Sequence, residues 1–223
     1  MCKLYVLATP LSQNYSEIPE YQISILKNVD LFIGEEKKFT VRLLAFLKMR
    51  DKPYLLINEH SVDDDYLVAL DEIKKVESAV FFSDCGTPSV ADPGYKLINM
   101  AYQNGVEVLS LPGPSSIMAA LSVSGFYAER FYFAGFPPKK GYERKNFFKK
   151  LERFKETVVL MERPYACKRV LDELQYLKKR ISISFNLGMP DEKTFRGFPK
   201  DVSKMLNDVK KAPFVIVMEG IKK

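Results

Sequence analysis

The sequence has few of the residues that build metal centres and disulfide frameworks. Its 223 residues include one histidine, three cysteines and no tryptophan. Cys2, Cys85 and Cys167 are odd in number and lie far apart, so we expect reduced, structural thiols rather than disulfides. With a single histidine available, a zinc site is not predicted either. We therefore expect no metal in this protein.

Long apolar runs are also absent. No stretch approaches the roughly 20 apolar residues that a membrane-spanning helix needs. The first six residues are too short and too strand-like for a signal peptide. A cytoplasmic protein without a membrane segment is predicted. Hydrophobic residues make up 47% of the chain, which is enough for a packed interior in one domain or in two small ones.

Two common nucleotide-binding motifs are missing as well. The first apolar run leads into Thr9-Pro10-Leu11-Ser12 and not into Gly-x-Gly-x-x-Gly. The chain has no Gly-Lys-Ser or Gly-Lys-Thr, so a P-loop is excluded. An ordinary dinucleotide-binding domain is therefore disfavoured.

Short apolar runs alternate with helix-like segments through the first half of the chain. This rhythm predicts an α/β fold with a mostly parallel sheet. A change of pattern after Gly125 places a domain boundary there and predicts domains at 1–125 and 126–223. The predicted strands are 4–8, 31–33, 54–57, 79–82, 106–109, 157–161, 181–185 and 214–219, and the predicted helices are 19–28, 40–48, 63–75, 94–104, 115–122, 142–154, 166–178 and 200–209.

Turn-forming and polar residues follow two of the predicted strands, at 83–94 and at 112–116. Open α/β sheets bind ligands at the carboxyl ends of their strands, so we expect these two loops to share one ligand cleft. Gly86 allows a close approach of backbone to ligand, and Pro88 stiffens the loop. For Asp92, which precedes a proline, the beginning of a helix is an alternative explanation.

Positive charge is concentrated in the second half of the chain. Residues 1–128 carry 11 Lys and Arg against 16 Asp and Glu, whereas residues 129–223 carry 23 against 12. Segregated positive charge is typical of proteins that bind nucleic acid, because Lys and Arg displace counterions from phosphates. A solvated lysine-rich surface would give the same counts, and both interpretations stay open.

Taken together, several motifs resemble the tetrapyrrole methylase-like family of S-adenosylmethionine-dependent methyltransferases, and within it the ribosomal RNA small subunit methyltransferase I branch. The resemblance covers most of the chain. The motifs that carry it are Thr9-Pro10, Ser83-Asp84-Cys85-Gly86-Thr87-Pro88, Asp92-Pro93-Gly94-Tyr95, Pro112-Gly113-Pro114-Ser115-Ser116 with Ala119-Ala120-Leu121, and Gly135-Phe136-Pro137-Pro138-Lys139-Lys140.

The resemblance implies a two-domain α/β enzyme, with a mostly parallel sheet in the first domain and a mixed sheet in the second. It implies a homodimer that binds S-adenosylmethionine between its domains and methylates a cytidine ribose 2′-hydroxyl of 16S rRNA in the small ribosomal subunit. For Met161, plain core packing is an alternative. Mapped onto this sequence, the donor contacts are Pro10, Asp84, Gly86, Thr87, Val90, Ser115, Ser116 and Met161.

The chain departs from this branch in the motifs that the resemblance assigns to the methyl acceptor. Glu35-Glu36-Lys37-Lys38 stands where the branch has Glu-Asp-Thr-Arg, and two of its histidines are missing. Two other functions therefore stay open: methylation of a tetrapyrrole or another small molecule, and noncatalytic RNA binding.

Catalysis of transfer to a hydroxyl would be helped by a general base, and carboxylates are the available type. Glu36 is our candidate, with a solvated or ion-paired carboxylate as the alternative. His60, the only histidine, is expected to be a loop residue without a catalytic role.

A dense group of cations occupies residues 139–155, interleaved with phenylalanines that are spaced like one face of a helix. We expect these cations to lie on an exposed face and to contact RNA phosphates. An ordinary amphipathic helix is the alternative. The residues predicted to bind RNA are Lys139, Lys140, Arg144 and Lys145.

Overall fold

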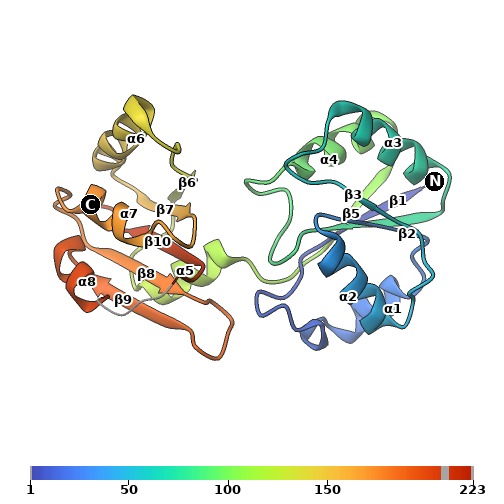
Figure 1. Ribbon diagram of the computed structural model, residues 1–223, viewed down its shortest axis with the longest axis horizontal. Coiled ribbons are helices and arrows are strands. Elements are labelled where there is room, and N and C mark those ends of the chain that lie inside the picture. Colours follow the sequence, from blue (N-terminus) through green and yellow to red (C-terminus); the bar gives the residue numbers. More distant parts are fainter. Residues whose placement is uncertain (1, 207–210, 222–223) are drawn as a thin grey trace. The chain divides into compact units, whose positions relative to one another are not determined.

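The computed structural model describes residues 2–206 and 211–221, and the chain divides into two compact units, Met1–Ser115 and Ser116–Lys223 (Figure 1). The division falls after Ser115, whereas the sequence placed it after residue 125. The difference comes from helix α5 (Ser116–Ser124), which packs against strands of the second unit's sheet. None of the helices in the described ranges has the length and apolar composition of a membrane span.

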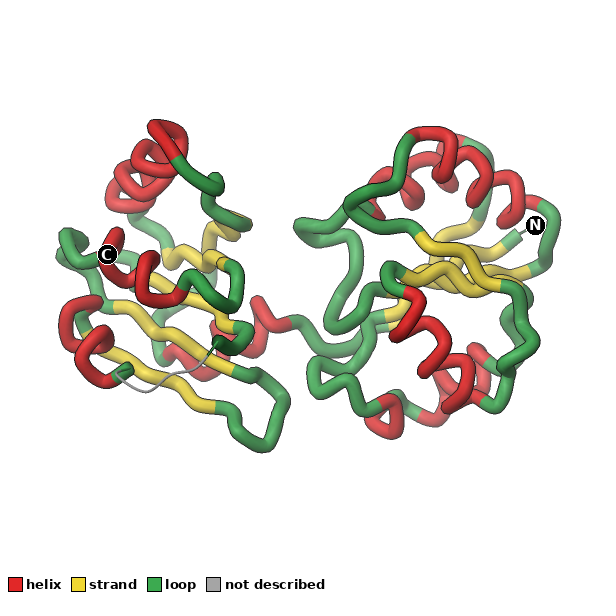
Figure 2. Tube along the Cα trace, viewed as in Figure 1, coloured by secondary structure: helices red, strands yellow, loops and turns green. Residues whose placement is uncertain are grey.

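The first unit is built on a five-stranded sheet in the order β3-β2-β4-β1-β5, and all its strand pairs are parallel. Helices α3 and α4 cover one face and α1 and α2 cover the other (Figures 1 and 2). The elements are β1 (Lys3–Leu7), the 3-10 helix η1 (Tyr15–Glu17), α1 (Glu20–Leu26), β2 (Leu31–Gly34), α2 (Lys37–Leu47), β3 (Tyr54–Leu56), α3 (Asp63–Lys74), β4 (Ser78–Phe82), α4 (Gly94–Gln103) and β5 (Glu107–Leu111).

Strand β4 shows why the apolar runs become central strands. Successive side chains of a strand point to opposite faces of the sheet. Ala79 and Phe81 accordingly belong to the core beneath α3 and α4, whereas Val80 and Phe82 belong to the core beneath α1 and α2. A strand buried on both faces needs a continuous apolar run, which is the pattern read from the sequence.

The second unit holds a five-stranded sheet in the order β6-β7-β10-β8-β9. Only the β6–β7 pair is parallel, so the expected mixed sheet is confirmed. Helices α6, α7 and α8 contribute to the main core of this unit. The elements after α5 are β6 (Phe131–Gly135), α6 (Gly141–Arg153), β7 (Thr157–Glu162), α7 (Cys167–Leu174), β8 (Ile181–Phe185), β9 (Lys193–Gly197), α8 (Pro199–Met205) and β10 (Phe214–Met218).

Strands β6 and β9 were not predicted, and both lie at the edges of this sheet. The polar composition of β9 is typical of an edge strand and lacks the continuous apolar pattern of a central one. Strand β6 is an apolar run, but it follows closely on the predicted domain boundary and was not assigned as a strand. Helix α7 ends at Leu174, before the predicted end at residue 178. The predicted helix at 200–209 corresponds to α8, and its last part, 207–209, lies outside the described residues.

Candidate functional site

Two loops are joined at the carboxyl edge of the parallel sheet, where β1 and β4 end. The amide of Thr9 donates to the carbonyl of Gly86 at 3.0 Å, and the amide of Gly86 donates to the carbonyl of Thr9 at 2.9 Å. The Thr9 hydroxyl also donates to the carbonyl of Ser83 at 3.0 Å. Because Thr9 is fully buried, these bonds fix the loop after β4 against the loop after β1.

The loop after β5 joins the same group. Thr87 Oγ1 donates to the carbonyl of Pro114 at 3.0 Å, which links the β4 loop to the β5 loop. On the other side, the buried Gln22 donates through Nε2 to the carbonyl of Pro112 at 2.7 Å. The two loops that the sequence singled out, 83–94 and 112–116, therefore lie together, as expected.

Two glycines make this close approach possible. Gly86 has φ of +79°, a conformation that L side chains rarely adopt. At Gly113 a Cβ atom would lie 2.8 Å from the carbonyl oxygen of Ala8, which is closer than real Cβ contacts. Larger residues at either position would separate the loops or strain the backbone.

The loop after β4 also carries strained backbone and an unsatisfied polar atom. Ser89 and Ala91 have φ of +67° and +64° without being glycine. The carboxylate of Asp92 holds this conformation by accepting from the amides of Ser89 at 2.6 Å and Gly94 at 2.8 Å. Such strain is concentrated at ligand sites in many proteins.

Within the described residues, Ser89 Oγ is one of two buried side-chain oxygens without a hydrogen-bond partner. A buried hydroxyl of this kind fits a site that takes a polar ligand. Sequence reasoning did not select Ser89, because a serine in a turn-rich loop gives no signal of its burial.

Two carboxylates lie where β2 and β4 end. Glu35 Oε2 accepts from the amide of Asp84 at 3.0 Å, and Asp84 Oδ1 accepts from the amide of Glu36 at 3.2 Å. Burial raises the pKa of Glu35 to about 7, with a further contribution from the carboxylates of Asp92, Asp84 and Glu36. Burial likewise raises the pKa of Asp84 to about 6.

Glu35 was missed at the level of sequence, although it directly precedes the selected Glu36. Its proximity to Asp84 depends on β2 and β4 being neighbours in the sheet, which sequence did not specify. Glu36 itself is exposed and occupies the N-cap of α2, where its side chain makes no capping hydrogen bond. Its carboxylate is thus accessible to a substrate, and its role as a base stays a prediction.

Most of the predicted donor contacts belong to the first unit and lie on the joined loops. Pro10 and Gly86 are buried, Asp84 and Ser115 are half-buried, and Thr87 and Val90 are exposed. Ser116 begins α5 and Met161 lies in β7, so both belong to the second unit. The structure brings together Pro10, Asp84, Gly86, Thr87, Val90 and Ser115.

The prediction that Arg144 lies on an exposed RNA-binding face is corrected by the structure. Its side chain is 2% exposed, and its guanidinium lies 2.7 Å from Glu162 and 2.7 Å from Glu173. Arg144 shares the inner face of α6 with Phe148 and Leu151, so it points into the unit. The periodicity of the phenylalanines contained this information, because Arg144 is four residues before Phe148.

The other predicted RNA-binding residues, Lys139, Lys140 and Lys145, are exposed at the beginning of α6. His60 is exposed on the loop after β3, and its Nε2 lies 3.8 Å from Glu59. Over the part of the chain that the structure describes, no group of three or more His, Cys, Asp or Glu residues is placed to hold a metal ion.

Sequence comparison identifies the family. The family model for Tetrapyrrole (Corrin/Porphyrin) Methylases matches residues 14–202. The chain belongs to the tetrapyrrole methylase family. The predicted class, methyltransferase, and the predicted donor, S-adenosylmethionine, are thereby confirmed as properties of the family.

Curated relatives carry one recurring name, Ribosomal RNA small subunit methyltransferase I. The relative from Vibrio cholerae is 33% identical over 78% of this chain and 60% of its own length. The relative from Leptospira borgpetersenii is 32% identical over 96% of this chain and 86% of its own length. The chain thus spans less than two thirds of the first relative and most of the second.

Solved structures share the fold at lower identity. The uroporphyrin-III C-methyltransferase from Thermus thermophilus, in complex with S-adenosylhomocysteine, matches with a TM-score of 0.63 and 16% identity. The match covers 97% of each chain. The two-sheet α/β fold expected from the sequence is therefore that of the tetrapyrrole methylases.

Proposed function

We propose that this protein is an S-adenosylmethionine-dependent methyltransferase that acts on RNA of the small ribosomal subunit, at a cytidine ribose 2′-hydroxyl. The observation that carries the proposal is the joined group of loops after β1, β4 and β5, at the edge where open α/β sheets bind ligands. The names of the curated relatives and the cations of the second unit support an RNA acceptor.

The residues of these loops fit the donor. Thr87 and Ser115 offer hydroxyls and Asp84 a carboxylate to its polar groups, while the exposed side chain of Val90 offers apolar contact to its adenine. Gly86 and Gly113 keep side chains out of the junction. The donor, when bound, supplies an activated methyl group on sulfur. Ser116 and Met161 belong to the second unit and stay predictions from the family resemblance.

The protein's main tasks in this reaction are alignment and exclusion of water, because the methyl group is already activated. The hydroxyl oxygen of the acceptor forms the new bond to the methyl carbon as the methyl–sulfur bond breaks, and its proton passes to a base. Sulfur keeps the electron pair of the broken bond and leaves as the neutral thioether of S-adenosylhomocysteine. Glu36 is the proposed base, since its carboxylate is exposed beside Asp84. Glu35 is tied to the amide of Asp84 and serves better to hold the loop.

The proposal is tested in two steps. Calorimetry with S-adenosylmethionine should show binding in the micromolar range or tighter, and its absence at millimolar donor would reject the enzyme in favour of a noncatalytic RNA-binding relative. Labelled donor is then incubated with small ribosomal subunits, with free 16S rRNA and with a porphyrin precursor. Label in the RNA is expected, and label in the porphyrin precursor alone would overturn the RNA assignment.

The position of the methyl group needs its own readout. Nuclease digestion of the labelled RNA followed by mass spectrometry of nucleosides should give 2′-O-methylcytidine, and a base-methylated nucleoside would overturn this part. We also propose a cytoplasmic homodimer, as the family resemblance implies. Sedimentation of the purified protein at micromolar concentration should give twice the monomer mass of 25.6 kDa.

A further inference from the structure

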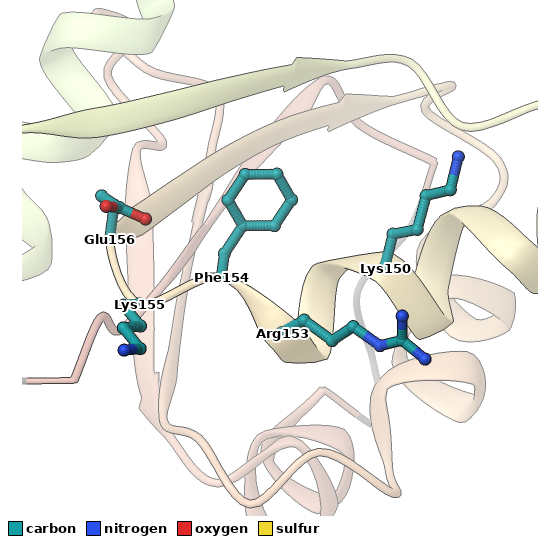
Figure 3. A pocket seen from close by; sticks show the side chains of 5 residues that line it. All are labelled: Lys150, Arg153, Phe154, Lys155 and Glu156. Atoms are coloured by element: carbon teal, nitrogen blue, oxygen red, sulfur yellow. The ribbon is translucent and has the colours of Figure 1, made fainter.

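A second basic site lies at the carboxyl end of α6. A surface pocket of about 460 Å³ is lined by Lys150 and Arg153 of α6 and by the segment that leads into β7. Figure 3 shows Phe154 after the end of the helix, with its ring directed to the other side of the chain from the side chains of Arg153 and Lys155. Lys139 and Lys140 precede the helix, so the pocket lies at its opposite end, about 20 Å along its axis.

Phe154, which lines this pocket, belongs to an aromatic stack. The rings of Phe154 and Tyr132 are stacked, with centroids 4.3 Å apart and planes inclined by 17°. Tyr132 lies on the edge strand β6 and is 46% exposed. An exposed tyrosine held flat against a second ring offers a rigid apolar surface, and that second ring, Phe154, lines the pocket with the three cations.

The outer face of α6 connects the two ends. Lys145, Lys149 and Arg153 recur every four residues and are exposed, whereas Arg144, Phe148 and Leu151 of the same helix are buried. Glu143 and Glu152 flank this row, and Glu156 lies on the rim of the pocket. Cations outnumber carboxylates both along the row and in the pocket, so the face as a whole attracts a polyanion.

We propose that this pocket, defined by Lys150, Arg153, Phe154 and Lys155, docks a single-stranded segment of RNA together with Tyr132, which stacks on Phe154. The three cations contact backbone phosphates, and a base stacks on the aromatic pair. This combination of a basic groove with an aromatic platform is the general means of holding unpaired nucleic acid. The proposal rests on the proposed RNA acceptor and adds a second contact region, distinct from Lys139 and Lys140.

The test uses the full-length protein and a fluorescent single-stranded RNA of 16 nucleotides, with the matching duplex as a second probe. The variant Lys150→Gln/Arg153→Gln/Lys155→Gln should weaken single-strand binding about tenfold or more. Its plot of log affinity against log salt should become less steep by about 2, since each single-strand phosphate contact contributes about 0.7. The control Lys178→Gln/Lys200→Gln/Lys204→Gln removes the same charge from other exposed positions and should change affinity less than twofold.

A second variant separates stacking from charge. Tyr132→Thr keeps a residue that suits an edge strand and removes the ring beneath Phe154. It should weaken binding of the single strand about fivefold, leave the salt dependence unchanged and affect the duplex less. The proposal would be overturned if the pocket variant and the lysine control lost RNA affinity equally. It would also be overturned if Tyr132→Thr weakened binding of the single strand and of the duplex equally. Equal competition by poly-glutamate would do so too, because it would show a general anion surface.

Failure of this inference is distinguishable from failure of the proposed function. Donor binding by calorimetry should be unchanged in all three variants, because none replaces a proposed donor contact. A wild-type protein that methylates ribosomal RNA, with a pocket variant of equal kcat/KM, would reject the docking pocket alone. A wild-type protein that binds no donor would reject the methyltransferase itself.

Discussion

Glu35 and Asp84 are joined by a hydrogen bond from the Asp84 amide to Glu35 Oε2, 3.0 Å long, and the Asp84 carboxylate in turn accepts from the amide of Glu36 at 3.2 Å. These bonds connect the end of β2 to the end of β4. Two carboxylates thus fix two loops at the carboxyl edge of the sheet, at the place where the donor is proposed to bind.

This arrangement makes the stability of the protein depend on pH. The pKa of Glu35 is raised from 4.5 in an exposed carboxyl to about 7, because burial disfavours its charged form. As pH rises, Glu35 therefore ionises at a lower pH in the unfolded chain than in the folded protein. The stability that protonated Glu35 contributes is fully present below pH 4.5 and is lost as pH rises toward 7. Glu35→Gln removes this loss, so the variant should gain stability relative to wild type between pH 4.5 and pH 7.5.

Urea unfolding of both proteins at pH 4.5, 6 and 7.5 provides the measurement. Asp84→Asn serves as a second case, in which the corresponding gain should appear between about pH 4 and pH 6 because the pKa of Asp84 is raised to about 6. A stability difference between Glu35→Gln and wild type that stays constant over this range would contradict the explanation.

Gly113→Ala should open the junction between the β1 and β5 loops. The new Cβ would lie 2.8 Å from the carbonyl oxygen of Ala8, and overpacking of this kind costs about 1 to 3 kcal/mol. Thermal unfolding should show a lower melting temperature, and calorimetry should show a lower affinity for the donor. Gly197→Ala is the matched control, since a Cβ there meets Val202 at 3.6 Å, an ordinary contact. Unchanged donor affinity in Gly113→Ala would separate this junction from the donor site.

Glu36→Gln should slow methyl transfer in a single turnover by about 100-fold or more, if its carboxylate takes the proton of the acceptor hydroxyl. Donor affinity should stay the same, because the amide of residue 36, which contacts Asp84, is retained. Glu59→Gln, on an exposed loop, is the control for loss of one negative charge. An unchanged single-turnover rate in Glu36→Gln would falsify its role as base.

Arg144→Ala should destabilise the protein by about 3 to 5 kcal/mol, because it removes the buried guanidinium from Glu162 and leaves that buried carboxylate with Arg163 alone. The neighbouring Lys145→Ala should stay within about 0.5 kcal/mol of wild type, since its side chain is exposed. Lys145→Ala should instead weaken RNA binding. Chemical denaturation measures the stability of each variant, and anisotropy with labelled RNA measures its RNA affinity. Weaker RNA binding without loss of stability in Arg144→Ala would place Arg144 on the surface.

The elements of the fold that sequence predicted best are those buried on both sides. The run Ala79-Val80-Phe81-Phe82 had to be a central strand, because each of its side chains needs an apolar neighbour on one face or the other. Edge strand β9 escaped prediction because one of its edges needs no partner, so a polar composition suffices there. Edge strand β6 is apolar and was missed beside the predicted domain boundary.

By itself the sequence determined the family, the alternation of strands and helices, and the loops after β4 and β5, because these follow from local patterns of apolar and turn-forming residues. Only the tertiary structure decided that Arg144 pairs with Glu162 and Glu173, that Glu35 holds Asp84, and that Ser89 carries an unsatisfied hydroxyl. Each of these depends on strand order or on packing between elements far apart in the chain. Local composition does not contain that information, since the same residues would be exposed or unpaired in another topology.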